Sequence, residues 1–286
     1  MGNSYRLEAS SHESVYKEEI EPAYFLTSSP VERPKLIIVG GQPGAGKTKV
    51  LEMAKKKFAD NNVVVVNTDD LREYHPQFEE LAIADDRQCA SHTHEDASGW
   101  NHQLLSRSLE TRRNVILEGV FKNSKKLLDI AELARKHGYE VSFSVVAVNK
   151  RFSIWGIHKR YEKEKLAKEH GRFVPLEYHN ECYQKLPETV GKIEALKAVD
   201  QIKIFTRDAF CLYSNELISG KWNGPEGAKL ALETERARKP SDAERVNYKL
   251  SWEPVFEDMK KRGASQEAVA EVKAIADMLI KDAFAG

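Results

Sequence analysis

The sequence predicts an α/β fold in which a parallel sheet is flanked by helices and followed by a helical extension. Short apolar runs alternate with amphipathic segments, which is the pattern of successive β–α–β units. A glycine-rich turn joins the first of these runs to a helix. From Glu216 onward the chain is mostly charged and helical in character. We therefore expect a core over residues 1–215, with 1–33 as a helical or irregular lead-in, and a helical extension over 216–286.

Continuous apolar runs mark the predicted strands. KLIIVG (35–40) is the first, and an uninterrupted apolar run is typical of a strand buried on both faces of a parallel sheet. The other predicted strands are NVVVVN (62–67), NVILEG (114–119), YEVSFSVVAV (139–148) and further strands within 201–214.

The segments between these strands have helical spacing of apolar residues. The clearest is SKKLLDIAELARKHG (124–138), which is amphipathic and closes with Gly138, a residue common at helix C-termini. The other predicted helices of the core are TKVLEMAKKKFA (48–59), LREYHPQFEEL (71–81) and ASGWNHQLLSRSLETR (97–112).

Composition excludes several classes of protein. Lys and Arg number 44 and Asp and Glu number 44, so the net charge is zero, which argues against a nucleic-acid binder held by its basic excess. Hydrophobic residues make up 41%, enough for a sizeable core. Three widely spaced cysteines imply neither a disulfide framework nor a metal site. With no apolar leader in 1–20 and no long apolar run, we expect a cytoplasmic protein without membrane contact.

Residues 41–48 read GQPGAGKT and fit the phosphate-loop pattern G-x-x-x-x-G-K-[ST], between a predicted strand and a predicted helix. Glycines let the backbone wrap a phosphate, and the helix N-terminus offers free N–H groups to the anion. Lys47 is expected to reach the β- and γ-phosphates of ATP, and the Thr48 hydroxyl to ligate Mg²⁺. The predicted ATP-binding residues are Gly41, Gln42, Pro43, Gly44, Ala45, Gly46, Lys47 and Thr48.

A phosphate loop occurs in switch GTPases, ATP-driven motors and small kinases. The guanine motif N-K-x-D of GTPases is not met, because Phe152 stands where Asp is required in 149–152. Motors usually carry an apolar strand that ends in Asp, whereas 114–119 ends in Glu118 and Gly119. A kinase instead needs a carboxylate near the γ-phosphate and arginines on a mobile lid. The fold is therefore expected to be that of a P-loop kinase.

Carboxylates follow the second predicted strand, in the run Thr68-Asp69-Asp70. The carboxyl edge of an open parallel sheet is where ligands bind. We expect Asp69 to be the general base and Asp70 to cap the following helix. The alternative is that either residue only caps that helix, a common role for Asp.

The segment 152–175 follows the fourth predicted strand and is dense in charge. Its lysines are equally well explained as a solvated helix face. Arg160 and Arg172 lie where a lid would fold over bound phosphates, and we expect them to be catalytic.

Taken together, GGQPGAGKT, NTDDLREYHP, THEDASGW, NVILEG, KRYE and GRFVP make the chain resemble the bacterial zeta toxins over about residues 34–214. These are P-loop kinases that phosphorylate a hydroxyl of UDP-N-acetylglucosamine. The resemblance implies that Asp69 is the catalytic base and that Arg160 and Arg172 are the lid arginines. It also implies that Glu118 lines the sugar-nucleotide pocket and that His75 contacts substrate.

Two positions depart from the family pattern. Val120 stands where the family usually has Thr, and it cannot hydrogen-bond a sugar or a phosphate. His102 aligns with a family carboxylate and is equally well explained as a substrate contact or as a surface helix residue. Both positions bear on the acceptor and leave the phosphotransfer chemistry unchanged.

The sequence therefore predicts an ATP- and Mg²⁺-dependent kinase of a UDP-activated sugar that acts as a toxin. The resemblance implies restraint by an antitoxin protein or by a segment of the chain itself. A kinase of NAD, a nucleoside or a small alcohol is one alternative, and a regulator that only binds ATP is another. Asp69 and the paired arginines disfavour the regulator, because a switch needs no base directed at a hydroxyl.

Overall fold

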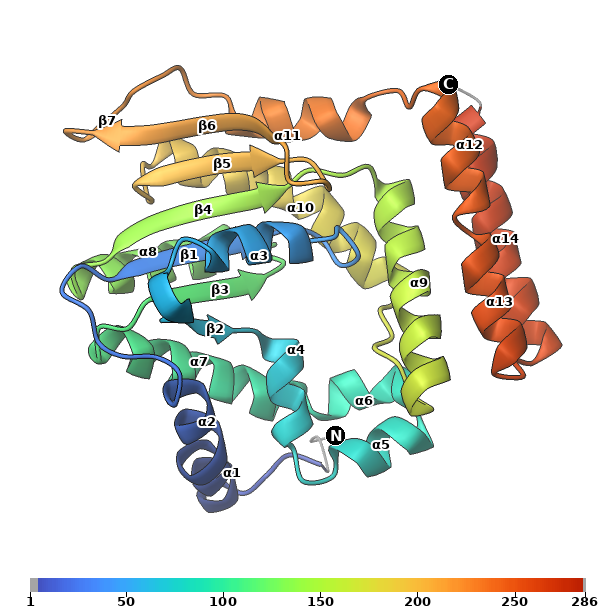
Figure 1. Cartoon of the computed structure of the whole chain (residues 1–286), viewed down its shortest axis with the longest axis horizontal. Helices are drawn as coiled ribbons and strands as arrows, with labels where there is room; N and C mark the ends of the chain where they lie inside the picture. Colours follow the sequence, from blue (N-terminus) through green and yellow to red (C-terminus); the bar gives the residue numbers. More distant parts are fainter. Residues whose placement is uncertain (1–4, 285–286) are drawn as a thin grey trace.

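The protein forms one seven-stranded sheet in the order β2-β3-β1-β4-β5-β6-β7, with helices on both faces (Figure 1). The computed structural model describes residues 5–284. The first five strands along the chain are parallel, and β6 and β7 pair antiparallel at one edge. Within the described residues, no helix has the length and apolar character needed to cross a bilayer.

The strands lie where the apolar runs predict them: β1 has the predicted bounds, β2, β3 and β4 are shorter than predicted, and β6 is longer. The second strand keeps only half of the predicted segment 62–67: at its carboxyl end Asn67 already caps the helix that follows, and at its amino end Asn62 still belongs to the end of a preceding 3₁₀ turn. The strands are β1 (Lys35–Gly40), β2 (Val64–Val66), β3 (Val115–Gly119), β4 (Glu140–Val146), β5 (Gln201–Phe205), β6 (Cys211–Ile218) and β7 (Lys221–Trp222).

The helices around the sheet begin with a lead-in and a short helix after the phosphate loop. These are α1 (Ala9–Val15), the π-helical turn η1 (Tyr16–Ile20), α2 (Glu21–Phe25), α3 (Thr48–Lys55), the 3₁₀ turn η2 (Ala59–Asn61), α4 (Thr68–Leu71), the 3₁₀ turn η3 (Arg72–Tyr74), α5 (Phe78–Ala84) and α6 (Asp86–His92). They continue with α7 (His94–Glu110), α8 (Ser124–Lys136), α9 (Lys150–Lys168), α10 (Leu176–Ala195), α11 (Ala228–Ala237), α12 (Asp242–Leu250), α13 (Glu253–Lys261) and α14 (Gln266–Phe284).

The helix expected over 71–81 is broken in two. Pro76 disfavours the helical conformation of the residue before it, and His75 is extended, with φ −70° and ψ 125°. The chain therefore leaves η3 at this point and resumes as α5.

Alternation along β1 shows how the sheet is buried. Leu36 and Ile38 join the large core beneath α7, α8, α10 and α11, whereas Ile37 and Val39 join the smaller core beneath α3. Both faces are thus covered, as the continuous apolar run predicts. This arrangement places the carboxyl ends of β1, β2 and β3 at one edge, where the loops that follow them meet.

The end of the core differs from the expected limit at residue 215. β6 runs on to Ile218, β7 follows it, and the helices expected from Glu216 begin only at Ala228. Antiparallel pairing to β5 explains why the strand continues past the expected boundary. The last three helices have a separate apolar core around Trp252 that also takes in Ile154 of α9. Figure 1 shows them standing along the outer side of α9.

Candidate active site

The phosphate loop lies between β1 and α3, as predicted. Gly44 and Gly46 have φ of +73° and +83°, the left-handed region in which a side chain is strained. A Cβ at Gly44 would also collide with the backbone carbonyl of Ser153 in α9. The loop is therefore built against the first turn of α9. Gly44 is required by both conformation and space, and Gly46 by its conformation.

Lys47 lies at the centre of this edge of the sheet. Its Nζ donates to the Gly41 carbonyl at 3.2 Å and lies 3.5 Å from Oε1 of Glu118, which lies near the end of β3. Asn67 donates from Nδ2 to Oε2 of the same carboxylate at 3.1 Å. Glu118 thus connects the phosphate loop to the helix that carries Asp69, a contact that a sequence position alone does not show.

Asp69 and Asp70 begin α4 at the end of β2. The expectation that Asp70 caps this helix is wrong, because the side chain of Asn67 accepts the backbone N–H of Asp69 at 3.0 Å. Burial acts to raise the pKa of Asp69, but the guanidiniums of Arg72, Arg160 and Arg172 more than offset it and hold the pKa below its usual range. Asp69 is therefore ionised at neutral pH and able to orient a hydroxyl.

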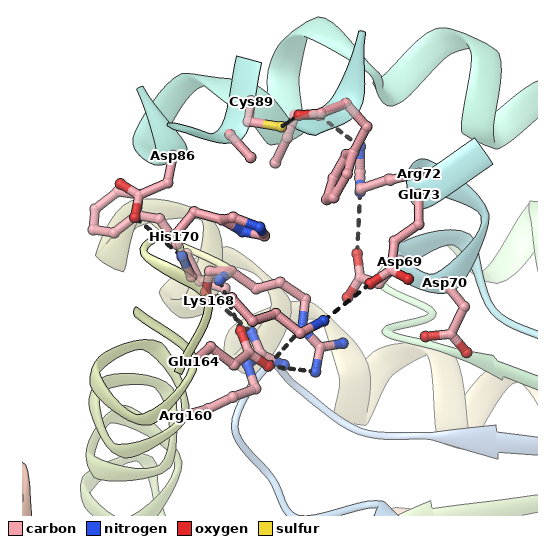
Figure 2. A pocket seen from close by; sticks show the side chains of 17 residues that line it. Asp69, Asp70, Arg72, Glu73, Asp86, Cys89, Arg160, Glu164, Lys168 and His170 are labelled. Carbon is pink, nitrogen blue, oxygen red and sulfur yellow. Dashed lines mark hydrogen bonds and ion pairs between the residues drawn. The ribbon is translucent and has the colours of Figure 1, made fainter. Parts of the chain in front are cut away.

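A pocket of about 150 Å³ lies between α4 and the lid formed by α9 and the loop after it (Figure 2). Asp69 and Asp70 line it from one side, and Arg160 and Arg172 line it from the other. Burial acts to lower the pKa of Arg172, but the Glu164 carboxylate, 2.7 Å from Nη2, raises it. The predicted base and both predicted arginines therefore share one pocket.

None of the four predicted substrate residues lines this pocket: Glu118 lies beside Lys47 instead, and His75, His102 and Val120 also lie outside the lining. His75 is 2% exposed, and its Nε2 lies 3.0 Å from the Tyr5 carbonyl and 3.5 Å from a carboxylate oxygen of Asp96. It holds the lead-in in place and does not face the pocket. His102 is an exposed residue of α7, and Val120 is half-buried just beyond the end of β3.

Two arginines that the sequence reasoning did not identify lie at the site. Arg72 donates from Nε to Oδ1 of Asp69 at 3.3 Å and from Nη1 to the Ala90 carbonyl at 2.6 Å. Arg207, in the turn after β5, lies against Gly46 and donates to the Phe152 carbonyl at 2.8 Å. The i, i+3 spacing from Asp69 is a signal for the first, and a position directly after a parallel strand is a signal for the second.

The donor set near the loop fits a magnesium ion that is bound largely through ATP. Within residues 5–284 no cluster of three or more His, Cys, Asp or Glu side chains could hold a metal ion. Thr48 at the start of α3 offers one hydroxyl, and Mg²⁺ is typically held by few protein groups together with substrate phosphates and water. Thr48 remains the predicted ligand.

Asp86, at the start of α6, holds the lid against the rest of the pocket. Its buried carboxylate accepts from Tyr161 Oη at 3.0 Å, from Lys165 Nζ at 2.8 Å and from the Gly171 backbone N–H at 3.1 Å. Gly171 directly precedes Arg172, so one carboxylate ties both α9 and the loop after it to α6. We infer that Asp86 positions the lid arginines.

Replacing Asp86 by Asn should lower kcat by roughly tenfold with little change in KM for ATP, because small displacements of positioned charges are costly in phosphoryl transfer. The Asn side chain keeps the shape of Asp86 but lacks the negative charge that pairs with Lys165. Hydrogen exchange of residues 169–174 should accelerate. The control is Glu271→Gln. It removes an exposed ion pair between Glu271 of α14 and Arg87, which lies on α6 beside Asp86, and its kcat should stay within about twofold of the wild-type value. If hydrogen exchange of residues 169–174 is unchanged in Asp86→Asn, Asp86 does not position the lid arginines.

The chain is similar to known proteins in sequence and in fold. The zeta toxin family model matches residues 19–218. Toxin PezT of Streptococcus pneumoniae is 27% identical over 218 residues, which are 72% of this chain and 86% of that protein. The zeta toxins of Enterococcus hirae and Streptococcus pyogenes are each 27% identical over 189 residues. These alignments span 65% of this chain and 65% and 64% of those toxins, less than two thirds of their length.

Solved structures share the fold. A chain from the PezAT toxin–antitoxin system of Streptococcus pneumoniae superposes with a TM-score of 0.74 at 21% identity, covering 91% of this chain and 100% of that one. A chain of the AvrRxo1-ORF1:AvrRxo1-ORF2 complex with ATP superposes with a TM-score of 0.57 at 13% identity, covering 98% and 87%. At these identities the likeness concerns the fold alone.

Proposed function

The chain belongs to the zeta toxin family, and from this premise we propose that it is an ATP-dependent kinase that phosphorylates a hydroxyl of a UDP-activated sugar and acts as a toxin. The observation that carries the proposal is the pocket in which Asp69 faces Arg160 and Arg172. A protein that only binds ATP needs a phosphate loop but no carboxylate and guanidinium groups around a separate pocket.

The proposed reaction transfers the γ-phosphoryl group of ATP to the acceptor. Asp69 orients the acceptor hydroxyl and takes its proton as the oxygen–phosphorus bond forms and the bond to the ADP oxygen breaks. Lys47 and the loop N–H groups hold the β- and γ-phosphates. Arg160 and Arg172 balance the negative charge that spreads over the transferring group. Magnesium bound at Thr48 would neutralise part of the phosphate charge.

The acceptor is proposed from the family resemblance, and so is the role of Val120 in setting its range, because Val120 follows β3 at the same sheet edge as Lys47 but does not line the pocket around Asp69. Val120 offers shape but no hydrogen bond beyond the end of β3, and an apolar contact discriminates weakly between isomeric sugars. UDP-glucose and UDP-N-acetylgalactosamine should therefore be phosphorylated at rates nearer to that of UDP-N-acetylglucosamine than in a relative with Thr.

The function is tested by measuring kcat/KM for these three UDP-sugars. NAD, a nucleoside and small alcohols are measured in the same panel as alternative acceptors. Val120→Thr should sharpen the preference among UDP-sugars by about 1 kcal/mol or less, the value of one hydrogen bond. Phosphorylation of another alcohol and of no UDP-sugar would replace the proposed acceptor. If no acceptor consumes ATP in this panel or in a cell extract followed by mass spectrometry, the kinase proposal fails.

A partner is also proposed. The structural relatives come from the PezAT toxin–antitoxin system and from an AvrRxo1-ORF1:AvrRxo1-ORF2 complex, which supports restraint of this chain by an antitoxin protein. A segment of the chain itself is the alternative. We place the reaction in the cytoplasm, where ATP is available.

A further inference from the structure

Arg236, near the C-terminal end of α11, carries a buried positive charge. Its side chain belongs to the segment beyond residue 215 and is 4% exposed in the structure. It is absent from every ion pair found within residues 5–284. The Glu233 carboxylate, one turn earlier on α11, attracts this charge and acts to raise the pKa of Arg236, but it forms no ion pair with it. A buried charge without a close counter-charge is costly, and this attraction and the partial negative charge at a helix C-terminus offset only part of that cost.

The guanidinium of Arg236 reaches the phosphate loop. Nη2 donates to Oε1 of Gln42 at 2.8 Å, and Nη1 donates to the Tyr183 carbonyl at 2.7 Å. Nε is buried and has no hydrogen-bond partner. The ring of Tyr183 lies 4.1 Å from the guanidinium carbon and contributes a cation–π contact. All of these partners are neutral.

Gln42 transmits this contact into the loop. It is fully buried, and with Oε1 occupied by Arg236 its Nε2 donates to the Val148 carbonyl at 3.0 Å and to Ser153 Oγ at 3.3 Å. Ser153 Oγ is in turn 2.8 Å from Nε2 of the buried His179. Arg236 thus fixes the amide orientation of Gln42 and joins α11, the loop and the start of α9.

A neutral donor could satisfy Gln42, so the hydrogen bond alone does not account for a charged residue. The charge is explained by what the loop is proposed to bind. Buried charges interact strongly because little water screens them, and a polyphosphate held on residues 43–48 would lie next to Gln42. Burial also lowers the pKa of Arg236 to about 10 in the structure without nucleotide.

We propose that Arg236 is a positioning residue of the nucleotide site, whose buried charge is balanced by the phosphates of ATP and which holds Gln42 in the loop. This rests on the proposed function insofar as the loop binds ATP. It assigns to the helical segment after the sheet a direct part in nucleotide binding.

The test compares nucleotides that differ in charge. Dissociation constants for ATP, ADP and AMP without metal are measured by calorimetry on the full chain and on Arg236→Met and Arg236→Lys. Arg236→Met should weaken ATP binding by about tenfold or more, ADP binding less and AMP binding least. Arg236→Lys should keep most of the ATP affinity. Arg238→Met is the control. It removes an exposed arginine that pairs with Glu235 and Glu244, and its dissociation constant for ATP should stay within about twofold of the wild-type value.

The proposal would be overturned if Arg236→Met weakened the binding of ATP, ADP and AMP equally, or weakened none of them. It would also be overturned if Arg236→Lys bound ATP no more tightly than Arg236→Met. If Arg236→Met does not fold, Gln42→Glu serves instead. It is close to Gln in shape, sets a carboxylate against Nη2 and should weaken ATP binding at least as much; unchanged affinity would overturn the proposal. Failure of the wild-type chain to bind ATP would instead overturn the proposed function, and this inference with it.

Discussion

Lys47→Ala should abolish ATP-dependent phosphoryl transfer, lowering kcat/KM by roughly three orders of magnitude or more. Among the residues that the structure describes, the Lys47 ammonium has two polar partners, the Gly41 carbonyl and the Glu118 carboxylate, so it is held ready for phosphates without building the core. The variant should therefore stay folded, and its melting temperature should change by only a few degrees. Turnover of Mg-ATP with a saturating acceptor and a thermal melt measure the two effects.

Lys49→Ala provides the matched control for Lys47. Lys49 is two residues further along α3, and its Nζ forms an exposed ion pair with Asp208 at 2.5 Å. Exposed pairs contribute little to stability, and this one lies outside the loop. Lys49→Ala should keep turnover within about twofold. A folded Lys47→Ala protein with near-normal turnover would exclude the phosphate-loop mechanism.

Asp69→Asn should slow phosphoryl transfer by roughly two to four orders of magnitude, the range for a lost general base. Asn cannot accept the hydroxyl proton, but it keeps the size of the side chain and a weaker contact with Arg72. The dissociation constant for ATP should change little, because the carboxylate lies in the pocket and not in the loop. Single-turnover kinetics and calorimetry separate the two quantities.

Asp70→Asn distinguishes the two neighbouring carboxylates. Asp70 lines the same pocket. Its pKa is raised, mainly by burial and also by the negative charges of Glu118, Asp69 and Glu73, although Arg172 opposes the shift. Since Asn67 already caps α4, loss of the Asp70 charge should leave the helix intact and cost less activity than Asp69→Asn. A larger loss in Asp70→Asn would reverse the assignment of the base.

The guanidiniums around Asp69 set the pH range of this activity. Their attraction holds the pKa of Asp69 below its usual range, so the carboxylate is ionised throughout neutral pH. Activity that needs the ionised form falls only as the pH drops through this lowered pKa. Arg72 makes the nearest of these contacts, at 3.3 Å, and was not identified from the sequence.

The sequence by itself determined the phosphate loop, the buried strands and the position of Asp69. Each depends on neighbours along the chain: glycines in a turn, an uninterrupted apolar run, and a carboxylate directly after a strand. Because parallel strands end at one edge of a sheet, these local features also placed the loop with Lys47 and the helix with Asp69 at the same edge of the sheet. The charged segment after the fourth strand also indicated Arg160 and Arg172, the family resemblance supported them, and the structure brings both to the same pocket as Asp69.

Only the tertiary structure decided the surroundings of the side chains. His75 follows Asp69 closely in sequence, yet the lead-in covers it through Tyr5, 70 residues away. Asp86 meets Gly171 across 85 residues, and Arg236 meets Gln42 across 194. Burial and charge pairing are made by segments that only the packed fold brings together. For that reason the pattern of the sequence located the chemistry, whereas the long-range packing selected which neighbouring side chains hold it in place.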